Sequence, residues 1–282
     1  MSSAPLIPAE PQPDQRPQNW DDHVSVYETV FEPFSLQFAE AAIDRLHLQV
    51  GQHVLDVGAG SGGAALALAA RGAKVTAVDA SMAMCARIAA RAAAQGVPIT
   101  AAAMDGQNLA LADDSFDAAL SVFGVILFPD AVRGLAEMRR VVRPGGRVAV
   151  VTWTQPEAYE LAAALRAATA AIRPTPPSGA LPAQLRYREQ SDFAALFRSA
   201  GFGEPTLSVQ SAHLHAPSAR WLASRIGFAP GMAATLAGLG SDADAVLARL
   251  VTDLEARHGA GALSLGGKAF VGSAVVPAGA HL

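Results

Sequence analysis

Short apolar runs that alternate with helical segments constrain the fold of this 282-residue chain more than any other feature. Five such runs are the candidate strands, at residues 53–57, 74–78, 98–104, 116–122 and 147–153. Ala- and Leu-rich segments with helical spacing separate several of them. Strands that alternate with helices form βαβ units, so we predict an α/β fold with a doubly wound, mostly parallel sheet.

The first strand runs directly into "DVGAGSGG" at residues 56–63, a turn that satisfies two fingerprints. From Gly58 to Gly63 it spells G-x-G-x-x-G, the dinucleotide pattern. From Asp56 to Gly62 it spells D-x-G-x-G-x-G, the pattern of S-adenosylmethionine (SAM) methyltransferases. Ligands of such sheets bind at the carboxyl ends of the strands, where a carboxylate repels a pyrophosphate and suits an ammonium group.

The second strand closes with another acid, Asp79, which lies 21 residues after Gly58 (79 − 58 = 21). An acid at this place holds ribose hydroxyls, and it serves a dinucleotide and SAM equally well. Ser81 is expected to cap the following helix and Gly96 to end it. Cys85, the single cysteine, lies on the inward face of that helix and rules out an intramolecular disulfide, which fits a reducing cytoplasm.

Four segments together resemble the class I SAM-dependent methyltransferases in order and spacing. They are "VLDVGAGSGG", "VTAVDASMAM", "MDGQNLALADDSFDAALSVFGVILFPD" and "EMRRVVRPGGRVAVVTW". The resemblance covers residues 20–153 and is strongest to the small-molecule branch that includes the quinone-biosynthesis C-methyltransferases. It implies a Rossmann-like sheet of seven strands with an antiparallel strand near the C-terminus, and it implies SAM as the cofactor.

The resemblance also implies which residues meet SAM, from its methionine end through ribose and adenine to the sulfonium. They are Tyr27, Asp56, Gly58, Ala59, Gly60, Asp79, Ala80, Ser81, Met82, Asp105, Gly106, Gln107, Ser121, Val122 and Phe123. Asp56 and the glycine turn are expected at the methionine part, Asp79 at the ribose and Asp105 at the adenine edge. Tyr27 is expected to close the methionine end.

A pocket for the methyl acceptor is expected beside the sulfonium. Phe123 and Trp153 follow the fourth and fifth strands, and Trp221 and Phe228 lie on helices predicted to fold back over them. The acceptor is therefore expected to be a small, apolar or aromatic molecule held in a mostly apolar pocket.

His213 and His215 are the candidates for a general base, because they lie on one face of a late strand that leads into these helices. The alternative is that they are surface or cap histidines. No ligand set has the spacing of a metal site, so no metal is predicted. Two alternative functions stay open: a nicotinamide-dependent reductase, although no Tyr is followed by a Lys four residues later, and a SAM-binding protein without catalysis.

The chain divides into four parts by composition and pattern. They are a Pro/Gln-rich disordered tail (1–19), an N-terminal helical cover (20–50), a SAM-binding core (51–154) and the C-terminal half of the same domain (155–282). The last part is expected to contain a helical lid (216–262) and the last two strands.

Charge and hydropathy exclude several partners. Only 16% of residues are charged, the net charge is −4 and no dense Lys/Arg cluster occurs, so nucleic acid is not expected as a partner. No apolar run reaches membrane-spanning length, and no signal peptide is evident. A cytoplasmic enzyme with a small-molecule acceptor is expected, and the sequence leaves open whether it forms a homodimer.

Overall fold

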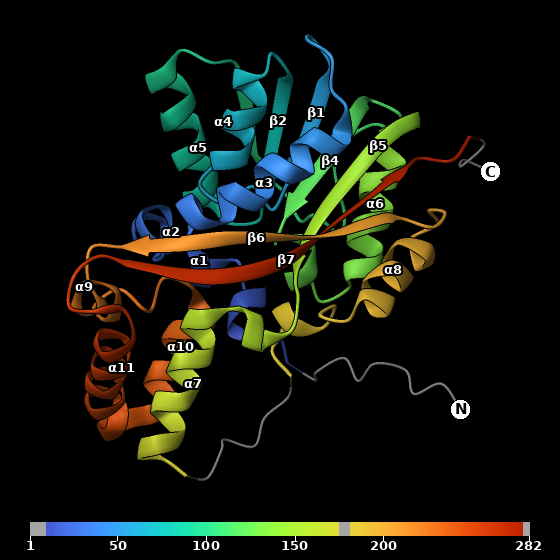
Figure 1. Ribbon diagram of the computed structural model, residues 1–282. Coiled ribbons are helices and arrows are strands. Elements are labelled where there is room, and N and C mark those ends of the chain that lie inside the picture. The colour runs from blue at the N-terminus through green and yellow to red at the C-terminus, as the bar shows by residue number, and fades with distance from the viewer. Residues whose placement is uncertain (1–9, 175–180, 279–282) are drawn as a thin grey trace.

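In the computed structural model, which describes residues 10–174 and 181–278, the described chain forms one seven-stranded sheet (Figure 1). The strands are β1 (His53–Val57), β2 (Lys74–Asp79), β3 (Ile99–Ala103), β4 (Phe116–Val122), β5 (Val142–Trp153), β6 (Thr206–Ala216) and β7 (Leu263–Val275). Their order is β3-β2-β1-β4-β5-β7-β6, and β7 runs antiparallel to both of its neighbours while the other pairs are parallel. The predicted fold class is confirmed.

Helices cover both faces of the sheet and one of its ends. They are α1 (Gln18–Asp21), α2 (Val24–Val30), α3 (Glu32–Leu46), α4 (Gly63–Ala70), α5 (Met82–Gln95), α6 (Ala131–Val141), α7 (Glu160–Ile172), α8 (Gln190–Ser199), α9 (Ala219–Ala223), α10 (Pro230–Leu239) and α11 (Ala243–His258). From the centre of the sheet, the connections β1–β2–β3 step toward one edge and the connection β4–β5 steps toward the other. Right-handed crossovers therefore place α4 and α5 on one face of the sheet and α6 on the opposite face. Helix α3 packs on the face of α4.

Local chemistry sets several of the element boundaries that the sequence predicted. Strands β1 and β4 have the predicted bounds. Ser81 Oγ accepts a hydrogen bond from Met84 N at 3.1 Å, and Gly96 ends α5 in the left-handed conformation with φ 65°. Strand β5 begins at Val142, earlier than predicted, and its pairing with β4 shifts register before Ala118.

The prediction of a disordered tail is wrong for residues 10–19, whereas residues 1–9 lie outside the described chain. Asp14 Oδ1 accepts a hydrogen bond from the backbone N–H of Gly231 at 2.6 Å, and Trp20 Nε1 donates to the Asp14 carbonyl at 2.9 Å. Polar tertiary contacts therefore order a segment that has little apolar area of its own.

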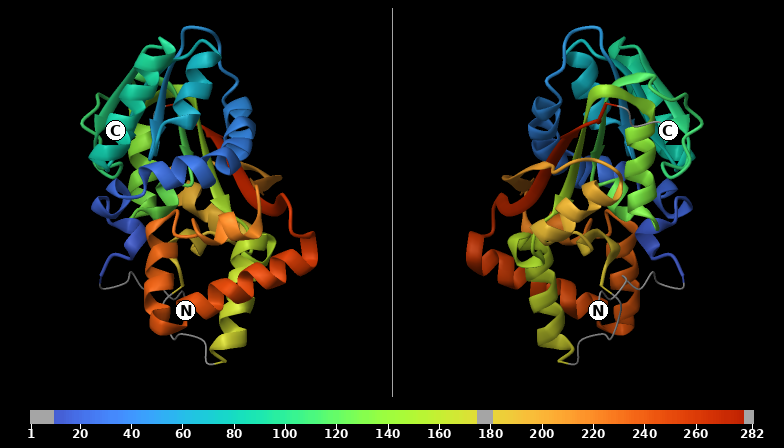
Figure 2. Two further views of the ribbon diagram at one scale, coloured as in Figure 1. Left: turned by 90° about the vertical axis from the view of Figure 1, so that its left-hand side faces the viewer. Right: turned by 90° about the vertical axis from the view of Figure 1, so that its right-hand side faces the viewer.

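The helices between β6 and β7 lie at one end of the molecule. Figures 1 and 2 show α7, α10 and α11 grouped there, beyond the sheet, and α11 packs along α7. Because α7 follows β5 after a short connection, this is the end that the parallel strands β4 and β5 point toward. The segment predicted to form a lid therefore lies near the carboxyl edge, where this fold binds its ligands.

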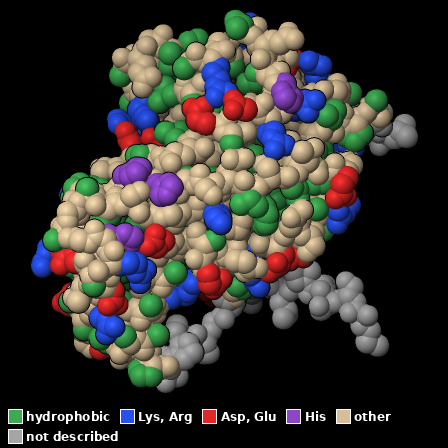
Figure 3. All heavy atoms as spheres, in the orientation of Figure 1, with side chains coloured by type: hydrophobic (Ala, Val, Ile, Leu, Met, Phe, Trp, Pro, Cys, Tyr) green, Lys and Arg blue, Asp and Glu red, His purple; other side chains and the backbone are tan. Residues whose placement is uncertain are grey.

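Charged side chains of both signs are interspersed over the face shown in Figure 3. Of the helices in the described ranges, none combines the length and the hydropathy needed to cross a bilayer.

Candidate functional site

The turn after β1 requires its glycines. Gly58, Gly60 and Gly62 adopt positive φ angles of 67°, 55° and 92°, which side chains disfavour. A Cβ at Gly58 would lie 2.8 Å from the Cα of Gly124, so two backbone segments pass in direct contact. The turn thus brings bare backbone to the carboxyl edge of the sheet.

Asp56 is the penultimate residue of β1, and its side chain is only 1% exposed. Its Oδ2 atom has no hydrogen-bond partner among the described residues. Burial, and secondarily the charge of Asp79, raises the pKa of Asp56 to about 7. A buried carboxylate oxygen without a donor is costly, which identifies Asp56 as a group that a cationic ligand would satisfy.

Asp79 ends β2 beside the same turn. Its Oδ2 accepts from Gly60 N and its Oδ1 from Ser81 N, both at 2.9 Å. Burial raises the pKa of Asp79 to about 6, although these hydrogen bonds lower it in part. From the cover, Asp21 Oδ1 accepts from Ser81 Oγ at 2.5 Å and from Ala83 N at 3.2 Å. The backbone N–H groups of Gly60 and Ser81 therefore fix the orientation of the Asp79 carboxylate.

A third carboxylate, Glu32 of α3, reaches the glycine turn and was missed by the sequence analysis. Its Oε1 accepts from Ser61 Oγ at 2.5 Å, from Arg91 Nη1 at 2.7 Å and from Gly63 N at 3.0 Å. Gly63 begins α4, and the N-terminus of a helix in this position is where dinucleotide folds bind a pyrophosphate. Here the anion site of α4 is filled by the chain's own carboxylate.

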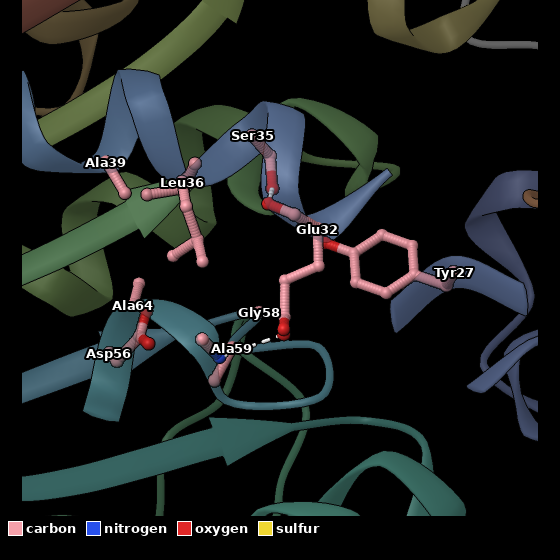
Figure 4. Close-up of a pocket in the computed structure, with 11 residues that line it drawn as sticks. Tyr27, Glu32, Ser35, Leu36, Ala39, Asp56, Gly58, Ala59 and Ala64 are labelled. Carbon is pink, nitrogen blue, oxygen red and sulfur yellow. Dashed lines mark hydrogen bonds between the residues drawn. The ribbon is translucent and has the colours of Figure 1, made fainter. Parts of the chain in front are cut away.

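Asp56 and Glu32 line a small cavity beside the glycine turn (Figure 4), whereas Asp79 lies outside its lining. The cavity has a volume of about 20 Å³, which is room for roughly one water molecule. Predicted residues in its lining are Tyr27, Asp56, Gly58, Ala59 and Val122. Residues in its lining that the sequence analysis missed are Glu32, Ser35, Leu36, Ala39, Gly63 and Ala64. Most of the missed residues come from α3, so the cover forms one wall of the cavity.

The residues expected at the adenine lie on the outer side of this edge. Ala80 is exposed, and Met82 is 74% exposed at the start of α5. Asp105 is also exposed, and its Oδ1 accepts from Gln107 N at 2.9 Å. Gly106 is buried, and a Cβ there would lie 2.4 Å from the ring of Phe128. The expected adenine contacts thus line an open rim and not the cavity.

Ser121 has a different position from the one expected. Its hydroxyl donates to the Val57 carbonyl at 2.7 Å and accepts from Val125 N at 2.9 Å. Both partners are main-chain groups, so the hydroxyl joins the ends of β1 and β4 and does not reach the cavity lining. Its neighbour Val122 does reach it.

Beside the cavity lies a cluster of aromatic rings, which we call the aromatic cluster. Its members are Phe31, Phe34, Phe38, Phe123, Trp153, Tyr159 and Phe228. Phe123 and Trp153 stack with ring centroids 4.3 Å apart, as expected of two residues at adjacent strand ends. Phe123 has φ 59°, a strained backbone for a bulky residue and of the kind found at functional sites. Phe228 joins the cluster by stacking on Phe31 at 5.4 Å.

Four rings of the aromatic cluster were missed by the sequence analysis. Phe31, Phe34 and Phe38 lie three and four residues apart, which is the spacing of one helix face and was the available signal. Tyr159 precedes α7 and carries no local signal of this kind. The cluster therefore joins the cover, the sheet edge and the lid.

The structure does not place Trp221 among the rings of the aromatic cluster, where the sequence led us to expect it. Helix α9 buries Ala219 and Leu222, which leaves Trp221 half-buried on its flank. The Arg225 guanidinium lies 4.7 Å from the Trp221 ring centroid. Among the described rings, none of the aromatic cluster contacts Trp221.

The expected role of the histidines as a general base is contradicted by their position. Side chains alternate along β6, so burial of Ala212 and Leu214 leaves His213 and His215 exposed. Strand β6 is also the edge strand, separated from β4 by β5 and β7. The structure does not bring either histidine to the cavity or the aromatic cluster.

Comparison with known proteins agrees with the motifs and the sheet. Residues 54–146 match the family model described as "Methyltransferase domain". An uncharacterised protein of Mycobacterium tuberculosis is 42% identical over 104 residues, which cover 37% of this chain and 38% of that protein. The demethylmenaquinone methyltransferase of Paenarthrobacter aurescens is 32% identical over 151 residues, which cover 52% of this chain and 58% of that protein.

The aligned segments thus span well under two thirds of these curated relatives' own lengths. Among solved structures, the YcgJ protein from Bacillus subtilis superposes with a TM-score of 0.57 at 21% identity, covering 86% of this chain and 98% of that chain. That likeness is one of fold. Residues 54–146 of the chain therefore match a methyltransferase domain, and the sheet has the fold of this solved structure.

Proposed function

We propose that this protein transfers the methyl group of SAM to a small acceptor with an apolar or aromatic body. The observation that carries the proposal is the set of three carboxylates, Asp56, Asp79 and Glu32, around the glycine turn. This site attracts an ammonium and a sulfonium through Asp56 and Asp79, while Glu32, ion-paired with Arg91, fills the N-terminus of α4 where a pyrophosphate would bind. It therefore favours SAM over a nicotinamide dinucleotide, which is the alternative that the G-x-G-x-x-G pattern left open.

Each carboxylate has a separate task in this proposal. The unpartnered Oδ2 of Asp56 binds the ammonium group, and Asp79, held by Gly60 N and Ser81 N, accepts hydrogen bonds from the ribose hydroxyls. Glu32 leaves the ligand alone and fixes the turn against α3. When bound, SAM supplies an electrophilic methyl group on its sulfonium.

The cover helices control access to this site. A cavity of about 20 Å³ is far below the several hundred Å³ of a ligand pocket, so part of the cover beside the glycine turn must shift for the methionine end of SAM to enter. The return of this part then excludes water and holds the reactants in place, which is the main contribution an enzyme makes to a methyl transfer.

The aromatic cluster supports an acceptor that carries a planar ring. Phe123 follows Val122, which lines the cavity, so the cluster adjoins the expected position of the sulfonium. Stacked rings bind aromatic ligands with defined orientation. The relative named as a demethylmenaquinone methyltransferase points in the same direction.

Methyl transfer is tested with SAM that carries a tritiated methyl group and a panel of hydroxylated bicyclic aromatics. We expect label to enter at least one organic product with the wild-type protein and none with Asp79→Ala. A protein that binds SAM and transfers label to no compound in the panel or in a cell extract would support a SAM-binding protein without catalysis. Reduction of a substrate by a nicotinamide cofactor would support the reductase.

A further inference from the structure

Tyr159 belongs to the aromatic cluster and carries a buried hydroxyl that nothing in the described chain uses. Its ring stacks on Trp153 with centroids 4.9 Å apart and on Phe34 at 5.5 Å. The Tyr159 hydroxyl is buried and has no hydrogen-bond partner among the described residues. A buried hydroxyl without a partner destabilises the fold, so its retention calls for an explanation.

Two other buried side-chain oxygens in the described ranges also lack a hydrogen-bond partner, but both lie outside the aromatic cluster. Asp56 Oδ2 belongs to the cofactor cavity. Thr152 Oγ1 precedes Trp153 on β5, and alternation along the strand points it to the opposite face of the sheet. Tyr159 is thus the unsatisfied polar side chain of the aromatic cluster.

Phe31 is the ring of the cluster that an acceptor can replace. It is only half-buried and lies at the junction of α2 and α3 in the cover that must move. Its centroid lies 6.1 Å from that of Phe123, 6.0 Å from that of Trp153 and 5.4 Å from that of Phe228. A planar acceptor in its place would contact rings of the sheet edge and the lid.

We propose that the Tyr159 hydroxyl binds an oxygen substituent on an aromatic acceptor and so fixes which way its ring enters the cluster. The inference rests on the proposed function and narrows its acceptor to a planar ring that carries a hydroxyl or carbonyl group. Burial raises the pKa of Tyr159 above its usual value. The hydroxyl therefore stays protonated and can donate a hydrogen bond to a hydroxyl or a carbonyl group.

The probes for this inference are 1-naphthol and naphthalene, which share one ring system and differ by a single hydroxyl. Each is titrated by fluorescence into protein saturated with S-adenosylhomocysteine, whose own binding is measured first by calorimetry. We expect wild-type protein to bind 1-naphthol about tenfold more tightly than naphthalene, the usual effect of one satisfied buried hydrogen bond. In Tyr159→Phe the preference is expected to fall below about twofold.

Tyr187→Phe is the matched control, because Tyr187 is partly buried elsewhere, beside the Arg186 guanidinium. It should keep the tenfold preference. Tyr159→Phe should melt at the same temperature as wild type or higher, since it removes an unsatisfied group, and this shows that the variant folds.

Two results would overturn the inference while leaving the cofactor site intact. In both results S-adenosylhomocysteine binds. In the first, wild-type protein does not bind 1-naphthol more tightly than naphthalene, or binds neither probe. In the second, Tyr159→Phe keeps the wild-type preference for 1-naphthol. Failure of S-adenosylhomocysteine to bind would instead contradict the proposed function itself.

Discussion

The proposed SAM site around the glycine turn, which we call the cofactor edge, lies beside the aromatic cluster, but the two are built in different ways. The cofactor edge uses three main-chain features close together in sequence: the ends of β1 and β2 and the glycine turn between them. The aromatic cluster takes its rings from residues 31 to 228, across cover, sheet edge and lid. The first is fixed by the strands, whereas the second forms only when distant segments meet.

Because the two regions are built from different segments, we expect substitutions in one region to leave the ligand affinity of the other unchanged. Changes at the cofactor edge should alter SAM affinity strongly, and changes in the aromatic cluster should alter acceptor binding with SAM affinity retained. Glu32 connects the two regions, because it lies on α3 with Phe34 and Phe38 while its carboxylate holds the glycine turn.

The largest effect is expected for Asp79→Ala. Loss of hydrogen bonds to two ribose hydroxyls, each worth about 1.5–3 kcal/mol, should weaken SAM binding at least tenfold. The exposed Asp105 serves as the comparison, because Asp105→Ala removes one solvated carboxylate from the open rim. Calorimetry that finds the same affinity for Asp79→Ala as for wild type would remove Asp79 from the site.

Asp56→Asn is expected to have opposite effects on binding and on stability. SAM affinity should fall about tenfold as the charge that meets the ammonium is lost. The ligand-free protein should melt about 5 °C higher at pH 8, because the variant no longer buries an unpartnered charge.

The sign of the pH dependence follows from the raised pKa values. An acid whose folded-state pKa lies above its unfolded value of 3.8 stabilises the fold at low pH, and this is lost as pH rises through about 6 for Asp79 and about 7 for Asp56. SAM affinity should rise over the same window as the carboxylates ionise. A melting temperature of ligand-free Asp56→Asn no higher than wild type at pH 8 would contradict this description of Asp56.

Phe228→Ala and Trp221→Ala test where the acceptor binds. Phe228 is buried against Phe31, so its loss should weaken 1-naphthol binding about fivefold in protein saturated with S-adenosylhomocysteine. Trp221 lies outside the aromatic cluster, and its loss should change that affinity less than about twofold. If both variants weakened 1-naphthol binding equally, the acceptor would contact Trp221 as well as Phe228, which contradicts the arrangement of the lid described here.

The smallest effect is expected for Asp14→Ala. Asp14 caps the first turn of α10 through Gly231 N, and loss of such a cap costs about 1 kcal/mol, or roughly 2–4 °C in melting temperature. The exposed Asp22 provides a control, since Asp22→Ala should leave the melting temperature unchanged. SAM affinity should hold in both variants. An unchanged melting temperature in Asp14→Ala would mean that the N-terminal segment does not anchor α10.

The cofactor edge was largely predictable from the sequence because its signals are local. A buried apolar run gives β1 its bounds, positive φ angles demand the glycines, and Asp56 and Asp79 follow from their places at strand ends. Ser81 and Gly96 likewise mark the beginning and the end of α5. The positions of these residues needed only their neighbours, whereas their roles toward SAM were implied by the resemblance that spans residues 20–153.

The aromatic cluster and the cover were predictable only in part. Phe123 and Trp153 follow from adjacent strand ends, but Tyr159 and Glu32 depend on helix packing that no local pattern specifies. The ordered segment at residues 10–19 depends on hydrogen bonds to α10, which composition cannot reveal. Trp221 was assigned because it lies on helices predicted to fold back over the strand ends, but α9 buries Ala219 and Leu222 and leaves Trp221 on its flank.

The most direct test of the carboxylate-lined site is calorimetry of one protein preparation at pH 7.5 with SAM, S-adenosylhomocysteine and NADPH. We expect SAM and S-adenosylhomocysteine to bind with one-to-one stoichiometry, and NADPH to give no binding heat, because Glu32 fills the place at the N-terminus of α4 that a pyrophosphate would need. Binding of NADPH that SAM displaces, with an affinity equal to or above that of SAM, would contradict the account.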